Sequence, residues 1–160
     1  MSDKNIKTFD YSHSGAGHIA CKRAPKPVGP YPHARRAGPF VFLSGVGPRK
    51  SGSKEIPGVT FDENGKVIAH DVKAQTESVI ENIKVILEDC ELTLESIVDI
   101  QVFLTHMKSD FKDFNEVYGK YFSQIGPTRT TVEVTALPTP IAVEFKVIAH
   151  FVVVSVLGPN

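Results

Sequence analysis

The sequence DVKAQTESVIENIKVILEDC at residues 71–90, followed by IVDIQVFL at residues 97–104, decides the fold of this chain. In the first stretch Asp71 has the residue type of a helix N-cap. Behind it the apolar residues recur at helical spacing, and the charged residues fall on the opposite face. The apolar face consists of Val72, Val79, Ile83, Ile86, Leu87 and Cys90, and the polar face of Lys73, Glu77, Glu81, Lys84 and Glu88. The second stretch is β-prone, so the pattern predicts a helix that packs on a sheet and leads into one of its strands.

Further elements extend this pattern in both directions. A second helix is predicted to start near Asp110, with an apolar side made of Phe111, Phe114, Val117, Tyr118 and Tyr121. Residues 130–134 and 142–154 are predicted strands, and FVFLS at residues 40–44 predicts a buried strand. The order of strands, helix, strand, helix and strands predicts an α+β domain, with the helices packed on one face of the sheet.

The remaining segments set the predicted boundaries. Residues 1–26 carry Gly, Pro and Ser without periodicity and predict an N-terminal arm, which leaves residues 27–157 as the domain. Residues 47–65 are irregular, and a segment of that length inside a compact domain is often functional. The run FVVVSVL at residues 151–157 does not alternate, so we expect both of its faces to contact apolar surroundings in a homo-oligomer.

The composition gives no support to several classes of function. The 160 residues have a hydrophobic fraction of 41%, and 18 basic residues balance 18 acidic ones, so no overall positive field supports nucleic-acid binding. Cys21 and Cys90 form no CxxC pair, and two isolated thiols fit a reducing compartment. No apolar run suffices for a membrane span or a signal peptide, so we expect a cytoplasmic protein with no membrane partner.

Common catalytic signatures are absent from the sequence, including GxSxG, HExxH, the P-loop and GxGxxG. His70 and His106 have no partner that spacing identifies and are interpreted as surface residues, with no metal site expected. Cys90 lies on the apolar side of the first predicted helix and is assigned to packing.

Two charged residues lie in or next to predicted strands at positions where they could bind substrate or transfer protons. Arg129 immediately precedes a β-prone strand, where a fixed guanidinium can hold a carboxylate through two parallel hydrogen bonds. Glu144 interrupts an otherwise apolar strand, so its carboxylate is paired, exposed, or held in a cleft as an acid or base. From these residues alone a salt bridge at a strand edge is the commoner explanation for each.

Seven short motifs resemble the Rid (YjgF-type) family of enamine and imine deaminases, in the same order and at similar spacing. They are PVGPY at 27–31, FLSG at 42–45, VFLT at 102–105, FNEVY at 114–118, PTRTTVEV at 127–134, LP at 137–138 and VE at 143–144. The resemblance implies a chorismate-mutase-like fold, a homotrimer, and active sites between subunits that need no cofactor.

The same resemblance implies roles for individual residues. Arg129 would grip the substrate carboxylate, and Glu144 would position water. Tyr31, Ser44, Gly45 and Asn115 would line the pocket, although packing by Tyr31 and bracing of the second helix by Asn115 are equally consistent with the sequence.

Three differences from common members of the family indicate which branch this chain resembles. Val46 replaces the Gln that follows Ser-Gly in common members, Thr131 replaces a frequent Cys, and a basic insertion begins at Arg49. With residues 32–38 and 137–142, the insertion is similar to the 2-aminomuconate deaminase branch. That substrate is a dicarboxylate, so a second cation is expected in the pocket, with Arg49 as the first candidate and Arg35 or Arg36 next.

Two other functions remain open. One is a general 2-iminopropanoate or 2-iminobutanoate deaminase, which the long insertion disfavours. The other is a non-enzymatic module that binds a small ligand or RNA, which the balanced charge and the absence of an aromatic and basic stripe disfavour.

Overall fold

The helix predicted from Asp71 runs over Val72–Glu88 (α1) in the computed structural model, which describes residues 17–151. Asp71 is the N-cap, because its side chain accepts a hydrogen bond of 3.1 Å from the Ala74 amide. The predicted apolar face is buried throughout, including Val79, Ile83 and Leu87, which are completely inaccessible to solvent. The helical periodicity in the sequence is therefore confirmed.

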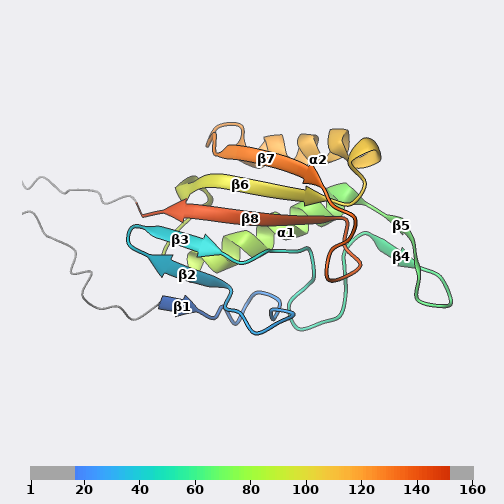
Figure 1. Cartoon of the computed structure of the whole chain (residues 1–160), viewed down its shortest axis with the longest axis horizontal. Coiled ribbons are helices and arrows are strands. Elements are labelled where there is room, and N and C mark those ends of the chain that lie inside the picture. Colours follow the sequence, from blue (N-terminus) through green and yellow to red (C-terminus); the bar gives the residue numbers. More distant parts are fainter. Residues whose placement is uncertain (1–16, 152–160) are drawn as a thin grey trace, which may run out of the picture.

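A six-stranded mixed sheet lies against this helix, with its strands in the order β1-β2-β3-β8-β6-β7 (Figure 1). Their bounds are β1 Gly17–Ile19, β2 Ala34–Ala37, β3 Phe40–Leu43, β6 Ile97–Leu104, β7 Thr128–Glu133 and β8 Val143–His150. β6 and β7 are parallel and joined through α2 (Met107–Phe122), while the other neighbours are antiparallel. A short 3-10 turn at Leu94–Ser96 precedes β6, and a separate hairpin pairs β4 (Val59–Phe61) with β5 (Val67–His70).

The hydrophobic core fills the space between the sheet and both helices, which confirms the predicted α+β layering. Every second residue of β8, and of β6 from Ile100 onward, is buried on this side, while the intervening ones are half-buried or exposed. The largest fully buried side chains include Phe114, Phe122, Phe145, Leu43, Ile80, Ile83, Ile86, Leu87, Ile100 and Leu104. We call the opposite side the open face; it carries Phe42, Phe103, Val132, Glu144, Lys146 and Ile148.

Three expectations about burial and boundaries were wrong. The strand at residues 40–44 is not buried on both sides, since Phe40 and Phe42 are 39% and 38% exposed on the open face. Phe111 and Tyr121 are also exposed, so the buried side of α2 is narrower than predicted. The long last strand ends at His150, and residues 152–157 of the apolar run lie outside the described part of the chain.

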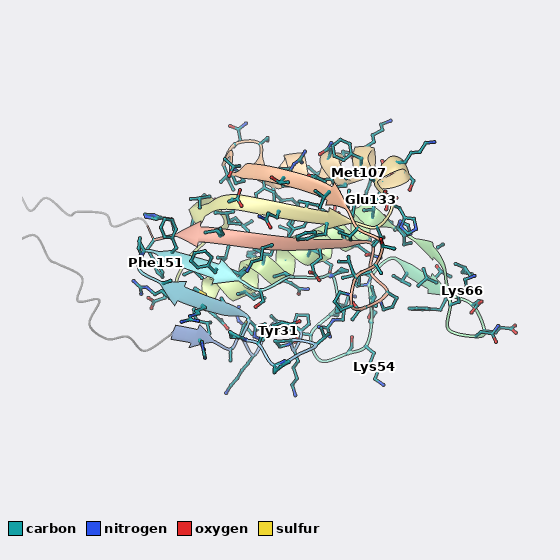
Figure 2. The ribbon with its side chains drawn as sticks, in the orientation of Figure 1. Tyr31, Lys54, Lys66, Met107, Glu133 and Phe151 are labelled. Atoms are coloured by element: carbon teal, nitrogen blue, oxygen red, sulfur yellow. The ribbon has the colours of Figure 1, made fainter. Side chains whose placement is uncertain are left out.

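The second helix begins at Met107, three residues before Asp110, because its cap is remote in sequence. Glu133, at the end of β7, accepts a hydrogen bond of 2.7 Å from the Met107 amide, and Figure 2 shows the two residues side by side. This carboxylate satisfies a free amide at the positive end of the helix dipole. Local sequence contains no sign of an acceptor 26 residues downstream.

Four short strands have no predicted counterpart. β1 lies inside the predicted arm and pairs with β2. β4 lies within the irregular segment at residues 47–65, and its partner β5 follows that segment. Within the described residues 17–151, none of the helices combines the length and apolar character needed to cross a membrane.

Candidate active site

A cavity at the carboxyl end of β3 brings together four of the residues predicted to bind substrate. Tyr31, Ser44, Gly45 and Arg49 all line it, together with Ala24, Pro25, Pro27, His33, Val46, Gly47 and Ile86. The Ser44 hydroxyl donates 2.6 Å to the Pro32 carbonyl, and the Ser44 amide donates 2.9 Å to the His33 carbonyl. These bonds fix the turn that follows β3 against the segment carrying Tyr31.

Glu144 lies directly against Gly45. A Cβ on Gly45 would overlap the Glu144 carboxylate oxygen Oε1 and lie 2.9 Å from its Cδ. A side chain at this position would therefore displace the Glu144 carboxylate from its present place. Gly45 thus separates the cavity from the carboxylate.

Burial raises the pKa of Glu144, because a partly desolvated carboxylate is less stable in its charged form. Lys146, two residues further along the open face, donates a hydrogen bond to the Leu43 carbonyl, and burial lowers its pKa. A carboxyl group with a raised pKa is suited to exchanging protons with water near neutral pH.

Arg129 belongs to a second group at the opposite edge of the sheet. Its Nη1 donates 2.8 Å to the Asn115 side-chain oxygen, and its guanidinium carbon lies 4.5 Å from the centre of the Tyr118 ring. Phe114 and Phe111 lie 5.4 and 6.0 Å away. The stacking on α2 fixes the plane of the Arg129 guanidinium. Asn115 accepts from one of the N–H groups of the guanidinium and leaves the others available.

Thr131 joins the Arg129 group, although sequence analysis gave it no role. It lines a shallow hollow with Met107, Lys108, Phe111 and Arg129. Its hydroxyl oxygen is buried and has no hydrogen-bond partner among residues 17–151. The substitution of a frequent Cys by Thr was the available signal, since a hydroxyl is the stronger hydrogen-bonding group.

The two groups lie on opposite faces of the sheet within one chain. Glu144 pairs with Phe103 of β6, and Arg129 pairs with Ile100 of the same strand. Because side chains alternate along a strand, positions 100 and 103 face opposite sides. One copy of the chain therefore assembles Tyr31, Ser44, Gly45, Arg49 and Glu144 at one place, and Asn115 and Arg129 at another.

A larger groove, which we call the basic groove, adjoins the cavity and shares Tyr31, His33 and Arg49 with it. Its cationic lining residues are Lys22, Lys26, Arg49, Lys50 and Lys54. Lys50 forms an ion pair of 2.7 Å with Glu55, which reduces its contribution to the positive potential. Tyr31 and Lys54, labelled in Figure 2, both line this groove.

Arg49 is held at the boundary between the cavity and the basic groove. Its Nη2 donates 2.7 Å to the Lys26 carbonyl, and its own carbonyl accepts 2.9 Å from Asn82 of α1. The insertion is thus anchored to α1. The reserve candidates Arg35 and Arg36 line neither space, and Arg36 instead stacks over the Phe151 ring at 4.1 Å.

The interpretation of His70 as an isolated surface residue was wrong. Its Nε2 lies 2.7 Å from the Asp110 Oδ2, and its ring centre lies 4.8 Å from that of His106. The sequence separates His70 and Asp110 by 40 residues, so spacing did not reveal the pair. Cys90 is buried as expected, and burial raises its pKa to about 11.

Comparison with known proteins adds independent information. A family model described as Endoribonuclease L-PSP matches residues 21–151. A RutC family protein of Pyrococcus abyssi is 39% identical over 132 residues, covering 82% of this chain and 94% of its own. Reactive Intermediate Deaminase A of Arabidopsis thaliana is 37% identical, covering 82% of this chain and 64% of its own.

Solved structures agree with this match. RidA from a Psychrobacter species superposes with a TM-score of 0.72 at 34% identity, covering 84% of this chain and 98% of its own. TdcF of E. coli, solved with bound serine, gives a TM-score of 0.71 at 33% identity with the same coverage. Both likenesses extend over nearly the whole described fold.

Proposed function

The chain belongs to the Endoribonuclease L-PSP family, which includes the RutC and Rid proteins, and on this premise we propose that it is a hydrolytic deaminase of enamines and imines. Its preferred substrate in this proposal is 2-aminomuconate. The name of the Arabidopsis relative, a reactive intermediate deaminase, supports the reaction class. The basic groove beside the cavity supports a substrate with a second carboxylate.

The reaction needs little from the protein beyond orientation and proton transfer. The enamine tautomerises to an imine, water adds to the C=N carbon, and the resulting carbinolamine expels ammonia to leave the 2-oxo acid 4-oxalocrotonate. One water is consumed and one ammonia released, without oxidation or reduction. Because the imine carbon is already electrophilic, the reaction requires no nucleophilic side chain.

The single observation that carries the proposal is the fixed guanidinium of Arg129. Tyr118 holds its plane and Asn115 takes one donor. The remaining donors can clasp the C1 carboxylate of the substrate in two parallel hydrogen bonds. This arrangement would place the adjacent C2, the reacting carbon, at a defined position.

Glu144 is proposed to move the protons. Its raised pKa lets it accept a proton from the attacking water and return it to the departing amine. Arg49 is proposed to bind the second carboxylate, because it alone among the cations of the basic groove also lines the cavity beside Gly45.

A complete site requires Arg129 and Glu144 from different copies of the chain, since one copy carries them on opposite faces of its sheet. We propose a homotrimer with a site at each subunit boundary. The exposed apolar residues of the open face, including Phe40, Phe42 and Val132, provide surface that such an assembly would cover.

Mixing two inactive variants tests this assembly. Arg129→Ala and Glu144→Gln chains are each expected to be inactive, but co-refolding equal amounts should restore about a quarter of the wild-type activity, because random assortment gives intact pairs at that frequency. The measurement is ammonia release by the mixture, with light scattering to count subunits. A site within one chain would leave the mixture inactive.

Arg49→Gln is expected to raise KM for 2-aminomuconate about 10- to 100-fold while kcat changes little, because one charged hydrogen bond to the second carboxylate is lost. KM for 2-iminobutanoate, which has one carboxylate, should stay unchanged. Lys54→Gln, in the same groove but outside the cavity lining, is the matched control. Equal effects of Arg49→Gln on both substrates would contradict this role.

Two alternatives have their own support. The bound serine in TdcF favours a small substrate with one carboxylate, as in a general 2-iminobutanoate deaminase. The family description and the basic groove favour an activity on RNA. RNA binding that depends on salt and on Lys26, but not on Glu144, would identify the second alternative.

The deciding experiment measures ammonia release and absorbance loss on 2-aminomuconate generated in situ, corrected for spontaneous hydrolysis. 2-Iminobutanoate is the comparison substrate, and RNA is assayed in parallel. Strong acceleration on the dicarboxylate supports the full proposal. Activity on 2-iminobutanoate alone would retain the deaminase and reject the substrate, and inactivity on both would reject the enzyme.

A further inference from the structure

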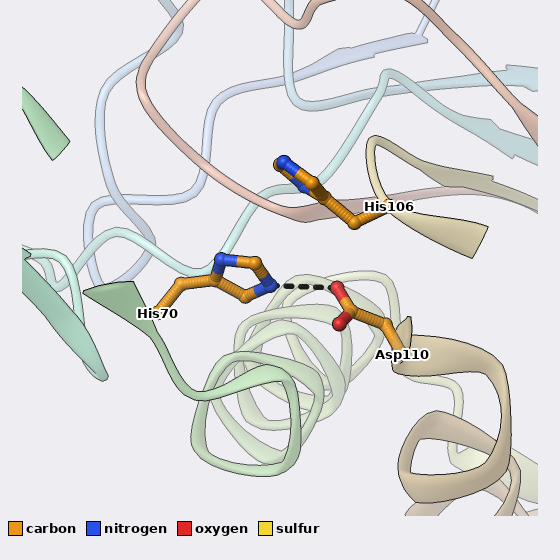
Figure 3. Close-up of side chains that lie close together, drawn as sticks. All are labelled: His70, His106 and Asp110. Atoms are coloured by element: carbon orange, nitrogen blue, oxygen red, sulfur yellow. Dashed lines mark hydrogen bonds and ion pairs between the residues drawn. The ribbon is translucent and has the colours of Figure 1, made fainter. Parts of the chain in front are cut away.

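A cluster of two imidazoles and a carboxylate lies away from the candidate active site, where three segments of the chain meet (Figure 3). His70 ends β5, His106 lies between β6 and α2, and Asp110 lies in the first turn of α2. None of the three residues lines the cavity beside Gly45 or the hollow at Arg129. The proposed deaminase mechanism assigns no role to any of the three.

The ligand atoms of this cluster are close enough to share one ion. The nitrogen and oxygen atoms that the three side chains offer lie within 4.8 Å of one another, and His70 and Asp110 are already 2.7 Å apart. In a tetrahedral site with bonds of about 2.0–2.1 Å, neighbouring ligand atoms lie about 3.3 Å apart. His106 is the exposed member of the cluster.

Neighbouring hydroxyl groups already orient two of the side chains. The Thr105 hydroxyl lies 2.8 Å from His106 Nδ1, and the Ser109 hydroxyl donates 2.9 Å to Asp110 Oδ1. These contacts involve neither His106 Nε2 nor Asp110 Oδ2. Asp110 Oδ2 is instead paired with His70 Nε2, so a shared ion would take the place of that hydrogen bond. Hydrogen bonds to the outer atoms of metal ligands have this same pattern, because they fix ring orientation and increase basicity.

Burial also favours an ion here. The side chains of His70 and Asp110 are only 19% and 8% exposed. A desolvated carboxylate next to two imidazoles strongly attracts a cation. A hollow lined by Thr105, Thr139 and Ala142, along with both histidines, adjoins the cluster and has room for a fourth, exchangeable ligand.

From these observations we propose that His70, His106 and Asp110 bind a divalent first-row transition metal ion, with an open coordination position facing the hollow. Two imidazoles and a carboxylate select ions of the zinc, cobalt and nickel type over magnesium and calcium, which prefer oxygen ligands. The ion would join the β4–β5 hairpin to the start of α2, so it should also stabilise the fold.

Titration of the tag-free chain with Zn²⁺ by calorimetry, and with Co²⁺ by visible ligand-field absorption, tests the proposal. We expect one ion per chain and a rise in the thermal unfolding midpoint when Zn²⁺ is added. His106→Gln and Asp110→Asn should each weaken binding at least about tenfold and remove the midpoint shift, because each removes one of three protein ligands. The exposed His18→Gln is the matched control and should bind like the wild type.

Asp110→Asn preserves the shape of its side chain, and His106 is exposed, so both variants should fold without metal. Their circular dichroism and unfolding midpoints in chelator verify this. Absence of stoichiometric binding by the wild type, or equal binding by wild type and both variants, would overturn the proposal. Deaminase activity after chelation is a separate readout and is expected to be unchanged.

Discussion

Arg129→Ala is expected to lower kcat/KM for 2-aminomuconate and for 2-iminobutanoate by about 10²–10³-fold, because the charged hydrogen bonds from the guanidinium to the C1 carboxylate are lost. We expect kcat/KM to fall for both substrates, because both carry the C1 carboxylate. The measurement is steady-state ammonia release, corrected for spontaneous hydrolysis.

Two further variants separate charge from geometry. Arg129→Lys keeps the positive charge but lacks the planar fork that Tyr118 and Asn115 hold in place, so its activity should fall between wild type and alanine. Arg23→Ala removes an exposed arginine that pairs with Glu88 and Asp89 and should leave activity intact. Full activity of Arg129→Ala would eliminate the carboxylate clamp.

Glu144→Gln is expected to reduce kcat by about 10²–10⁴-fold, the usual contribution of a positioned acid or base. The amide fits the same space against Gly45 but can neither accept nor return a proton. Glu116→Gln makes the same chemical change on the exposed side of α2, where Glu116 pairs with Lys73, and is the matched control. Unimpaired turnover by Glu144→Gln would remove this residue from the mechanism.

The pH dependence of the wild type gives an independent test of Glu144. Because burial raises its pKa above the ordinary 4.5, the acid limb of the rate profile should lie above that value. The folded chain holds this proton more tightly than the unfolded chain does. The corresponding stability is present below pH 4.5 and is lost as pH rises through the folded pKa, and urea midpoints of Glu144→Gln should lack this dependence.

Local patterns predicted the long elements well. The apolar spacing from Val72 to Cys90 is compatible with only one face of the helix packing on the sheet. Any other face would expose Ile83 and Leu87. The short strands β1, β2, β4 and β5 were not predicted, because they lack the continuous apolar run that marked the equally short β3, and their pairing partners fix them instead. The start of α2 was also predicted wrongly, because the group that caps it, the Glu133 carboxylate, is distant in sequence.

The sequence named candidate residues for the site but not their arrangement. Tyr31, Ser44, Gly45 and Arg49 line one cavity, and of these Arg49 was proposed from its charge and its place in the insertion rather than from a motif. The division between the Glu144 group and the Arg129 group depends on strand register across β8, β6 and β7. A difference of one residue in that register would reverse the face of each side chain.

The sequence by itself determined the two helices, the central strands, the α+β class and the family, because apolar periodicity and residue motifs are local properties. Only the tertiary structure decided that Arg129 and Glu144 project from opposite faces, that basic residues form a groove adjoining the cavity, and that His70 meets Asp110 and His106. These results depend on pairings between residues far apart in the chain. Such pairings are selected by the packing of the whole sheet against its helices, and no local stretch of sequence encodes them.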